Sequence, residues 1–219
     1  MKLFTACDCW PTRRNFLKAG AAIVTGFSSL ALFPQSSAAQ DEDDWSIGPR
    51  PGFSPEIGIL TSMLAFTRRQ VLHNVKGMSQ QDLDFLLDAK ANTIGALLLH
   101  LAATETYYGL NTFGGMKWDS WSDDTKKKWD TPMNLNEPAR KAIKGNNLDY
   151  YLNILHESRE KNLQEFRKRD DKWLTLVDKD MGGMNNYGKW FHVAEHESNH
   201  DGQIKFLKSR LPGAKPAAE

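Results

Sequence analysis

Cysteine is nearly absent from this chain of 219 residues, which holds only Cys7 and Cys9. Both lie close to the N-terminus, so the rest of the chain can form no disulfide and carries no thiol nucleophile. A surplus of charge of one sign is missing too, because 28 Lys and Arg residues stand against 27 Asp and Glu residues. This balance gives no electrostatic reason to expect binding to nucleic acid or to an anionic membrane surface.

The sequence also lacks a long hydrophobic run. The apolar stretch at 19–33 is too short, and too rich in Gly, Ser and Thr, to span a membrane comfortably. It follows a basic start with Arg13-Arg14 and precedes small residues that end in Ala38-Ala39, an order typical of a cleaved export signal. The paired arginines resemble a twin-arginine signal, which is an address and not an anchor. We therefore predict a signal peptide at 1–39, cut after Ala39, with Ala38 as the alternative.

This signal predicts the protein's location and changes its charge. The twin-arginine export machinery would be its first partner, and the mature protein would be periplasmic or extracellular with no stable membrane anchor. Residues 1–39 hold four of the basic residues and one of the acidic residues, so the mature chain keeps 24 and 26. No binding to nucleic acid is expected from this composition either.

The mature chain is predicted to have one helical domain at 56–211, between an extended leader at 40–55 and a disordered tail at 212–219. Apolar residues recur at helical spacing over four long stretches: 54–75, 92–110, 148–169 and 186–211. Shorter helices are predicted at 79–87 and 137–144. No stretch shows the alternation of a β-strand.

These helices predict an all-α fold, an antiparallel four-helix bundle with extra short helices. A long loop at 111–136 would connect the second and third long helices. A loop of this length is usually a lid, a binding loop or an irregular excursion. Its three tryptophans either line a pocket or, in the simpler interpretation, cover one end of the bundle.

The last long helix contains His192, His196 and His200 at intervals of four residues. Each interval turns a helix by about 40° and rises about 6 Å, so neighbouring imidazoles share a face. Val193 and Ile204 mark the buried direction, and His196 and His200 lie within that arc while His192 lies to its side. Two imidazoles one turn apart can bind one divalent metal.

His100 is the only histidine of the second long helix, and we predict that it completes a metal site with His196 and His200. His192 is expected beside this site or as an alternative ligand. Three imidazoles leave a coordination position open, as in catalytic zinc sites, although nickel and ferrous iron accept the same ligands. The alternative is a metal-free core in which the histidines hydrogen-bond to carboxylates.

Three charged residues lie on the apolar stripes of different helices: Arg68, Glu105 and Arg159. They form an internal ion-pair network, or the arginine stems pack while their charged heads reach water, or the three residues line a polar pocket next to the metal in which the arginines bind an anionic substrate. The first alternative is favoured, because charges on such stripes are usually paired with one another.

Glu197 and Tyr107 are the candidate catalytic residues, one flanking the histidine stripe and the other lying on the flank of His100. Glu197 could orient a histidine or act as a base, and Tyr107 could approach a metal-bound water. Glu197-x-x-His200 also matches half of a di-iron carboxylate motif. Because no second Glu-x-x-His exists in the chain, a di-iron site is not expected.

The segments GALLLHLAA at 95–103 and HVAEHESNHDGQI at 192–204 resemble the DinB-like family. The resemblance extends over about residues 45–211 and implies a four-helix bundle that holds a divalent metal through His100, His196 and His200. Characterised relatives include thiol-dependent S-transferases and a thiol-dependent isomerase. This chain departs from the family at Asp201, where relatives often have an arginine. Export also counts against a thiol cofactor, because such thiols are mainly cytosolic.

The sequence therefore predicts an exported DinB-like enzyme that uses a three-histidine divalent metal, with an open position, for hydrolysis or group transfer. Its small-molecule substrate is not specified by any motif. The alternative is a non-catalytic bundle that binds metal or a partner. A homodimer remains open, because exposed bundle faces often pair.

Overall fold

The computed structural model describes residues 45–214. The predicted signal peptide with its cleavage site, the start of the leader and the end of the tail lie outside these residues. No helix within 45–214 is both long enough and apolar enough to cross a membrane.

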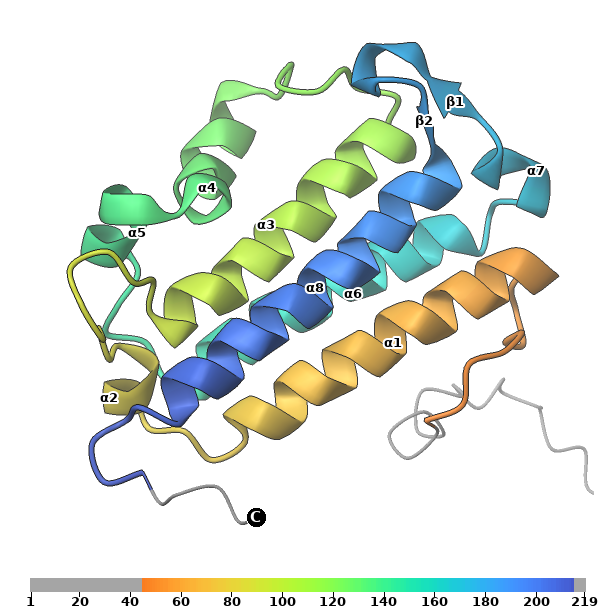
Figure 1. Cartoon of the computed structure of the whole chain (residues 1–219). Helices are drawn as coiled ribbons and strands as arrows, with labels where there is room; N and C mark the ends of the chain where they lie inside the picture. Colours follow the sequence, from red (N-terminus) through yellow and green to blue (C-terminus); the bar gives the residue numbers. More distant parts are fainter. Residues whose placement is uncertain (1–44, 215–219) are drawn as a thin grey trace, which may run out of the picture. The chain divides into compact units, whose positions relative to one another are not determined.

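Four long helices build the domain, which is all-α as predicted: α1 (Pro55–Val75), α3 (Ile94–Thr112), α6 (Leu148–Phe166) and α8 (Asn186–Lys208). Figure 1 shows α8 between α1 and α3, with α6 behind them. Three short helices accompany them: α2 (Gln80–Leu83), α5 (Asn136–Ala142) and α7 (Asp171–Leu174). The first two of these overlap the short helices predicted at 79–87 and 137–144.

The long helices form two pairs, and the antiparallel arrangement expected of the bundle holds between the pairs and not within them. Contacts between α1 and α8 advance in the same direction along both helices, from Thr67 with Glu197 to Asn74 with Asp201. The α3 and α6 helices are parallel in the same way, and the two pairs run opposite to each other (Figure 1). The reason is the connection between α3 and α6, which is long enough to return the chain to the end of the bundle where α3 begins.

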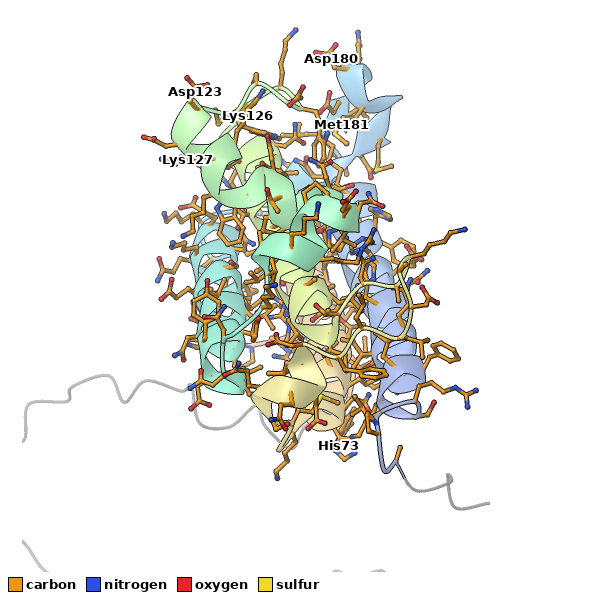
Figure 2. The ribbon with its side chains drawn as sticks, turned by 90° about the vertical axis from the view of Figure 1, so that its left-hand side faces the viewer. His73, Asp123, Lys126, Lys127, Asp180 and Met181 are labelled. Carbon is orange, nitrogen blue, oxygen red and sulfur yellow. The ribbon has the colours of Figure 1, made fainter. Side chains whose placement is uncertain are left out.

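That connection is largely helical, which corrects the predicted loop at 111–136. The α4 helix (Asp123–Asn134) occupies half of it, and Ser122 caps this helix by accepting a hydrogen bond from the Thr125 amide at 3.3 Å. Figure 2 shows Asp123, Lys126 and Lys127 projecting outward from α4. Because so much of α4 is polar, it has no wide apolar stripe from which the sequence could reveal a helix.

A short β-ribbon also escaped prediction. Strands β1 (Val177–Asp178) and β2 (Met184–Asn185) pair antiparallel around the short 3₁₀ segment η2 (Lys179–Met181). Two glycines in the left-handed region, with φ of 68° and 81°, complete the turn. Two-residue strands are too short to show the alternation that predicts a strand.

A buried ion-pair network joins all four long helices. It consists of Arg68 from α1, Glu105 from α3, Arg159 from α6 and Glu197 from α8, and none is more than 8% exposed. Glu105 pairs with Arg68 at 2.5 Å and with Arg159 at 2.6 Å, while Glu197 contacts both arginines. This confirms the favoured alternative, an internal network. Two positive and two negative groups balance, so no net charge is buried.

The residue before each α-helix caps it through its side chain, except at α1 and α5. Asn185 begins α8 by accepting a hydrogen bond from the Gly188 amide at 2.8 Å. Ser54 precedes α1 but makes no cap of its own; its hydroxyl donates to Asp171 at 2.5 Å. The Asp171 carboxylate also accepts from the amides of Glu56 and Ile57. A carboxylate from α7 therefore caps α1, which ties two distant parts of the chain together.

Candidate metal centre

The centre lies between α3 and α8, which run side by side in opposite directions (Figure 1). His196 and His200 are one turn apart on α8, and His100 faces them from α3. The ring centroids of His196 and His200 are 4.4 Å apart, and those of His100 lie 4.9 and 4.7 Å from them. The structure thus brings together the three histidines that the sequence selected.

The three side chains converge through the same ring nitrogen. His196 Nε2 lies 3.1 Å from His100 Nε2 and 3.1 Å from His200 Nε2. Ligand atoms of all three lie within 4.8 Å of one another, and in residues 45–214 no other group of His, Cys, Asp or Glu converges in this way. The Nε2 atoms therefore surround one small space.

Hydrogen bonds on the far side of two rings set which nitrogen carries the proton. His100 Nδ1 donates to the Pro132 carbonyl oxygen, and His200 Nδ1 donates to Gln203 Oε1, each at 3.1 Å. With the proton on Nδ1, the Nε2 lone pair of each ring faces the shared space. His196 Nδ1 is buried and has no partner among the described residues.

Burial keeps these imidazoles neutral. Desolvation, with repulsion from the neighbouring rings, lowers the pKa of His100 to about 4 and that of His196 to about 3. Desolvation also lowers the pKa of His200, against the hydrogen bond to Gln203. Neutral imidazole is the form that binds metal, so near pH 7 the cluster presents three ligands and no charge of its own.

The cluster fits a divalent metal. A metal roughly 2.0–2.1 Å from each nitrogen would separate neighbouring nitrogens by about 2.9 Å at right angles and by about 3.3 Å at the tetrahedral angle. The two observed separations of 3.1 Å lie between these values. Without a cation, Nε2 lone pairs would repel one another at this distance, and a metal would accept all three.

A sequence model of the mycothiol S-transferase family matches residues 59–213. The chain belongs to this family. The match covers more than half of the chain and includes every residue of the histidine cluster. Since mycothiol S-transferases belong to the DinB-like superfamily, the resemblance drawn from the two histidine segments is confirmed. No curated protein matches this chain significantly.

In this mycothiol S-transferase relative, His192 lies next to the cluster but not in it. Its ring centroid is 5.6 Å from that of His196 and 5.9 Å from that of Tyr108. Its Nδ1 hydrogen-bonds Glu195 at 3.1 Å, and its side chain is 43% exposed. This is the position beside the site that the helical wheel of α8 predicts.

The candidate catalytic residues Glu197 and Tyr107 are placed elsewhere. Glu197 belongs to the ion-pair network, where its carboxylate contacts Arg68, Arg159 and Thr67. Its side chain therefore points to the bundle interior, away from the histidine face of α8. This corrects its assignment as a base beside the metal.

Tyr107 lies against α4. Its hydroxyl donates to Asp130, and its ring stacks on Trp121 with centroids 4.9 Å apart. Burial, with this hydrogen bond and the charge of Asp130, raises the pKa of Tyr107 well above its usual value. Tyr107 therefore holds its proton and fastens α4 over α3, so its contacts indicate a structural role.

Two groups that orient the histidines were not found from the sequence. Gln203 follows His200 by three residues, and this helical spacing was a usable signal. No sequence pattern could reveal the role of Pro132, because the group that contacts His100 is its backbone carbonyl and Pro132 belongs to α4, a helix that was not predicted. Asp201, at the position where the sequence departs from relatives, is buried and joins α8 to α1 by accepting from Asn74 at 2.6 Å.

Proposed function

We propose that this protein is an exported, metal-dependent S-transferase whose divalent metal is held by the Nε2 atoms of His100, His196 and His200. The convergence of these three nitrogens, two of them with a fixed proton on Nδ1, carries the proposal. The family match supports the reaction class, since its name specifies transfer to the sulfur of a thiol. The alternative, a core of uncharged histidines, leaves lone pairs facing one another.

The thiol must be a second substrate. Beyond residue 9 the chain has no cysteine, so the protein cannot supply a sulfur nucleophile from its folded domain. A low-molecular-weight thiol, mycothiol in the name of the family, fits this requirement. Because such thiols are mainly cytosolic, an exported transferase would depend on thiol that is present outside the cytoplasm. A divalent metal at the cluster would lower the pKa of a bound thiol and so supply thiolate, the reactive form, near neutral pH.

The side chains around the cluster have definable tasks in this reaction. The Pro132 carbonyl and Gln203 keep His100 and His200 in the orientation that exposes Nε2. His192 would accept the proton that the thiol releases, since it is partly exposed and lies beside His196. The sulfur then forms a bond to the electrophilic carbon of the acceptor, whose leaving group departs with its electron pair.

Metal analysis and a thiol-transfer assay on untagged protein test this function. We expect about one equivalent of divalent metal per chain. We also expect the protein to consume a chromogenic aryl halide only when a thiol is added, which is followed by absorbance. Replacing His100, His196 or His200 singly by Ala should abolish both metal binding and transfer. The matched control is His156→Ala, which removes an exposed histidine of α6.

Two results would contradict the proposal. Metal below about a tenth of an equivalent, with a melting temperature unchanged by added zinc, nickel or iron, would exclude the metal site. Metal binding without thiol-dependent turnover would instead support a non-catalytic metal-binding bundle.

Export by the twin-arginine route is part of the proposal and rests on the sequence at 1–39. Changing Arg13-Arg14 to Lys-Lys should keep the protein in the cytoplasm, with its precursor uncut. Fractionation followed by N-terminal sequencing of the exported form measures this, and Lys18→Arg is the charge-preserving control. Normal processing of the Lys-Lys variant would contradict this route.

A further inference from the structure

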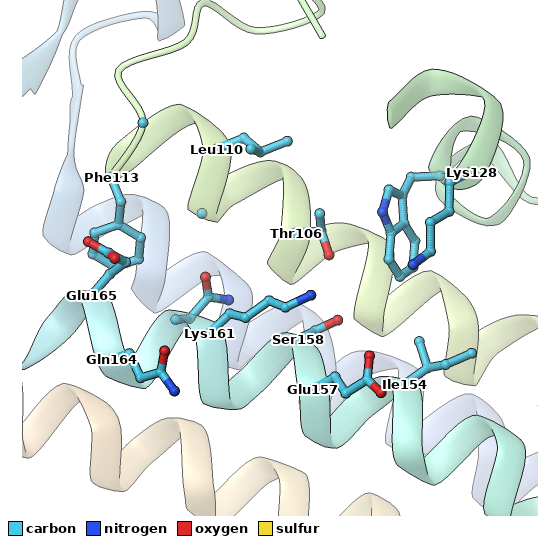
Figure 3. Close-up of a pocket in the computed structure, with 14 residues that line it drawn as sticks. Thr106, Leu110, Phe113, Lys128, Ile154, Glu157, Ser158, Lys161, Gln164 and Glu165 are labelled. Carbon is cyan, nitrogen blue, oxygen red and sulfur yellow. The ribbon is translucent and has the colours of Figure 1, made fainter. Parts of the chain in front are cut away.

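A groove of about 470 Å³ lies between α3, α4 and α6, and none of the three clustered histidines lines it. Figure 3 shows it in close-up, with α3 above and α6 below. The family resemblance and the proposed transfer reaction make no use of this surface. Several of its polar side chains nevertheless extend into the space between α3 and α6 (Figure 3).

Ser158 is the first sign that the groove is built for a ligand. The residue is only 6% exposed, yet its hydroxyl hydrogen-bonds no other residue within 45–214. In Figure 3 this hydroxyl points into the groove from α6. The Ser158 oxygen is not sealed from solvent, so a ligand or a water in the groove can reach it and form the hydrogen bond that the protein does not supply.

Lys161 and Glu157 are the second sign. They are exposed residues four positions apart on α6, a spacing that allows a salt bridge, and Glu165 lies four residues beyond Lys161 as a second possible partner. Even so, neither side chain forms an ion pair with any residue in the described part of the chain. Lys161 instead extends along the groove toward Ser158, and the Glu157 carboxylate rises beside it (Figure 3).

The opposite wall adds Thr106 and Lys128. The Thr106 hydroxyl donates to the Ala102 carbonyl at 2.8 Å, so its oxygen is left to accept a hydrogen bond. The Lys128 ammonium, 4.8 Å from the centroid of the Trp129 ring, points down from α4 into the same space (Figure 3). Glu165 also lines the groove, but its carboxylate pairs with Lys168 and Arg169. The groove therefore presents two ammonium groups, one unpaired carboxylate and two hydroxyls around one space.

This combination selects a ligand by charge. A cation would be repelled by Lys128 and Lys161, and a multiply charged anion would be repelled by Glu157. A single carboxylate suits the two ammonium groups. Glu157 then needs a donor, which a neighbouring ligand hydroxyl provides, and Trp129 offers an apolar surface to the carbon chain.

We propose that this groove binds a small hydroxy-carboxylic acid. Its carboxylate lies between Lys128 and Lys161 and accepts the Ser158 hydrogen bond, while its hydroxyl donates to Glu157. The groove is separate from the histidine cluster, so the test of acid binding does not depend on whether the protein is a transferase.

Calorimetric titration with three probes of similar size tests the chemistry: glycerate, propionate and glycerol. Glycerate carries both groups, propionate lacks the hydroxyls and glycerol lacks the carboxylate. We expect glycerate to bind at least about tenfold more tightly than either. No binding of glycerate, or equal binding of propionate or glycerol, would overturn the proposal.

Variants test the location. Lys161→Gln and Ser158→Ala should each weaken glycerate binding by about tenfold without changing the melting temperature, because neither group is paired in the folded protein. Glu157→Gln should reduce the preference for glycerate over propionate, because it weakens the acceptor for the glycerate hydroxyl. Lys144→Gln, an exposed lysine in the turn before α6, is the matched control and should bind as the unaltered protein does.

A carboxylate could also bind a metal at the histidine cluster, so the titration is repeated on His200→Ala. Retained glycerate affinity in that variant places the ligand in the groove. Loss of binding in His200→Ala, with unchanged binding in Lys161→Gln, would assign the carboxylate to the metal centre and refute a groove site.

Discussion

Replacing Glu105 by Gln is the sharpest test of what holds the four long helices in register. Glu105 is 1% exposed and accepts hydrogen bonds from Arg68, Arg159 and Asn162. Burial alone would raise the pKa of this carboxyl. The charges of Arg159 and Arg68, with their hydrogen bonds, outweigh burial and hold the pKa below its usual value.

The magnitude follows from the charge that Gln leaves behind. In the Glu105→Gln variant, two buried guanidinium groups share the single carboxylate of Glu197, so one positive charge is uncompensated. Breaking a buried pair in this way costs about 3–5 kcal/mol of unfolding free energy. For a domain of this size, that corresponds to a melting temperature lower by about 6–20 °C.

Urea unfolding followed by circular dichroism measures the loss. Glu137→Gln is the matched control, because Glu137 pairs with Lys141 at 2.6 Å but both side chains are more than half exposed. This control should leave the unfolding midpoint unchanged, since exposed pairs contribute little.

A second substitution tests the charge argument itself. Adding Arg159→Gln to Glu105→Gln restores neutrality, with Arg68 left opposite Glu197. The double variant should therefore lose less than the sum of the two single variants, by at least about 1 kcal/mol. A loss of less than about 1 kcal/mol for Glu105→Gln alone, or strict additivity, would refute the reasoning.

Two further predictions concern the helix caps and pH. Asp171→Ala removes the acceptor at the start of α1 and should lower the unfolding free energy by about 1 kcal/mol in urea titrations; full stability in Asp171→Ala, or no recovery in Asp171→Asn, would mean that this cap is dispensable. Metal-free protein should lose stability as pH falls from about 6.5 toward 4. Burial lowers the pKa of His100 and His196 in the folded protein, so between these pH values the unfolded chain binds more protons than the folded one. The stability that is present at pH 7 is therefore lost as the pH falls through this range. Urea midpoints at pH 7, 6 and 5 measure this, and an equal slope in the His100→Ala variant would exclude His100 as a contributor.

The sequence predicted the candidate metal ligands because their signal is local. A four-residue interval on a helix places His196 and His200 on one face whatever the surroundings are. His100 could be selected because it is the only histidine of its helix. The apolar stripes gave the four long helices in the same way, with errors confined to a few residues at their ends.

Other features depended on which segments meet in space. The direction of α6 relative to α3 follows from the helical connection between them, and α4 lacks the apolar periodicity that would have revealed it. Glu197 shows the limit most clearly. The sequence places it between two histidines, but only the packing of α8 against α1 and α6 decides that its carboxylate faces Arg68 and Arg159.

The sequence by itself determined the four long helices, the four-residue spacing of the α8 histidines and the absence of a thiol beyond residue 9. Those properties belong to single segments and to composition. The tertiary structure alone decided that His100 Nε2 meets those of His196 and His200, that the Pro132 carbonyl orients His100, and that two arginines and two glutamates neutralise one another. Each of these requires atoms distant along the chain to meet within about 3 Å, and no local pattern specifies such a meeting.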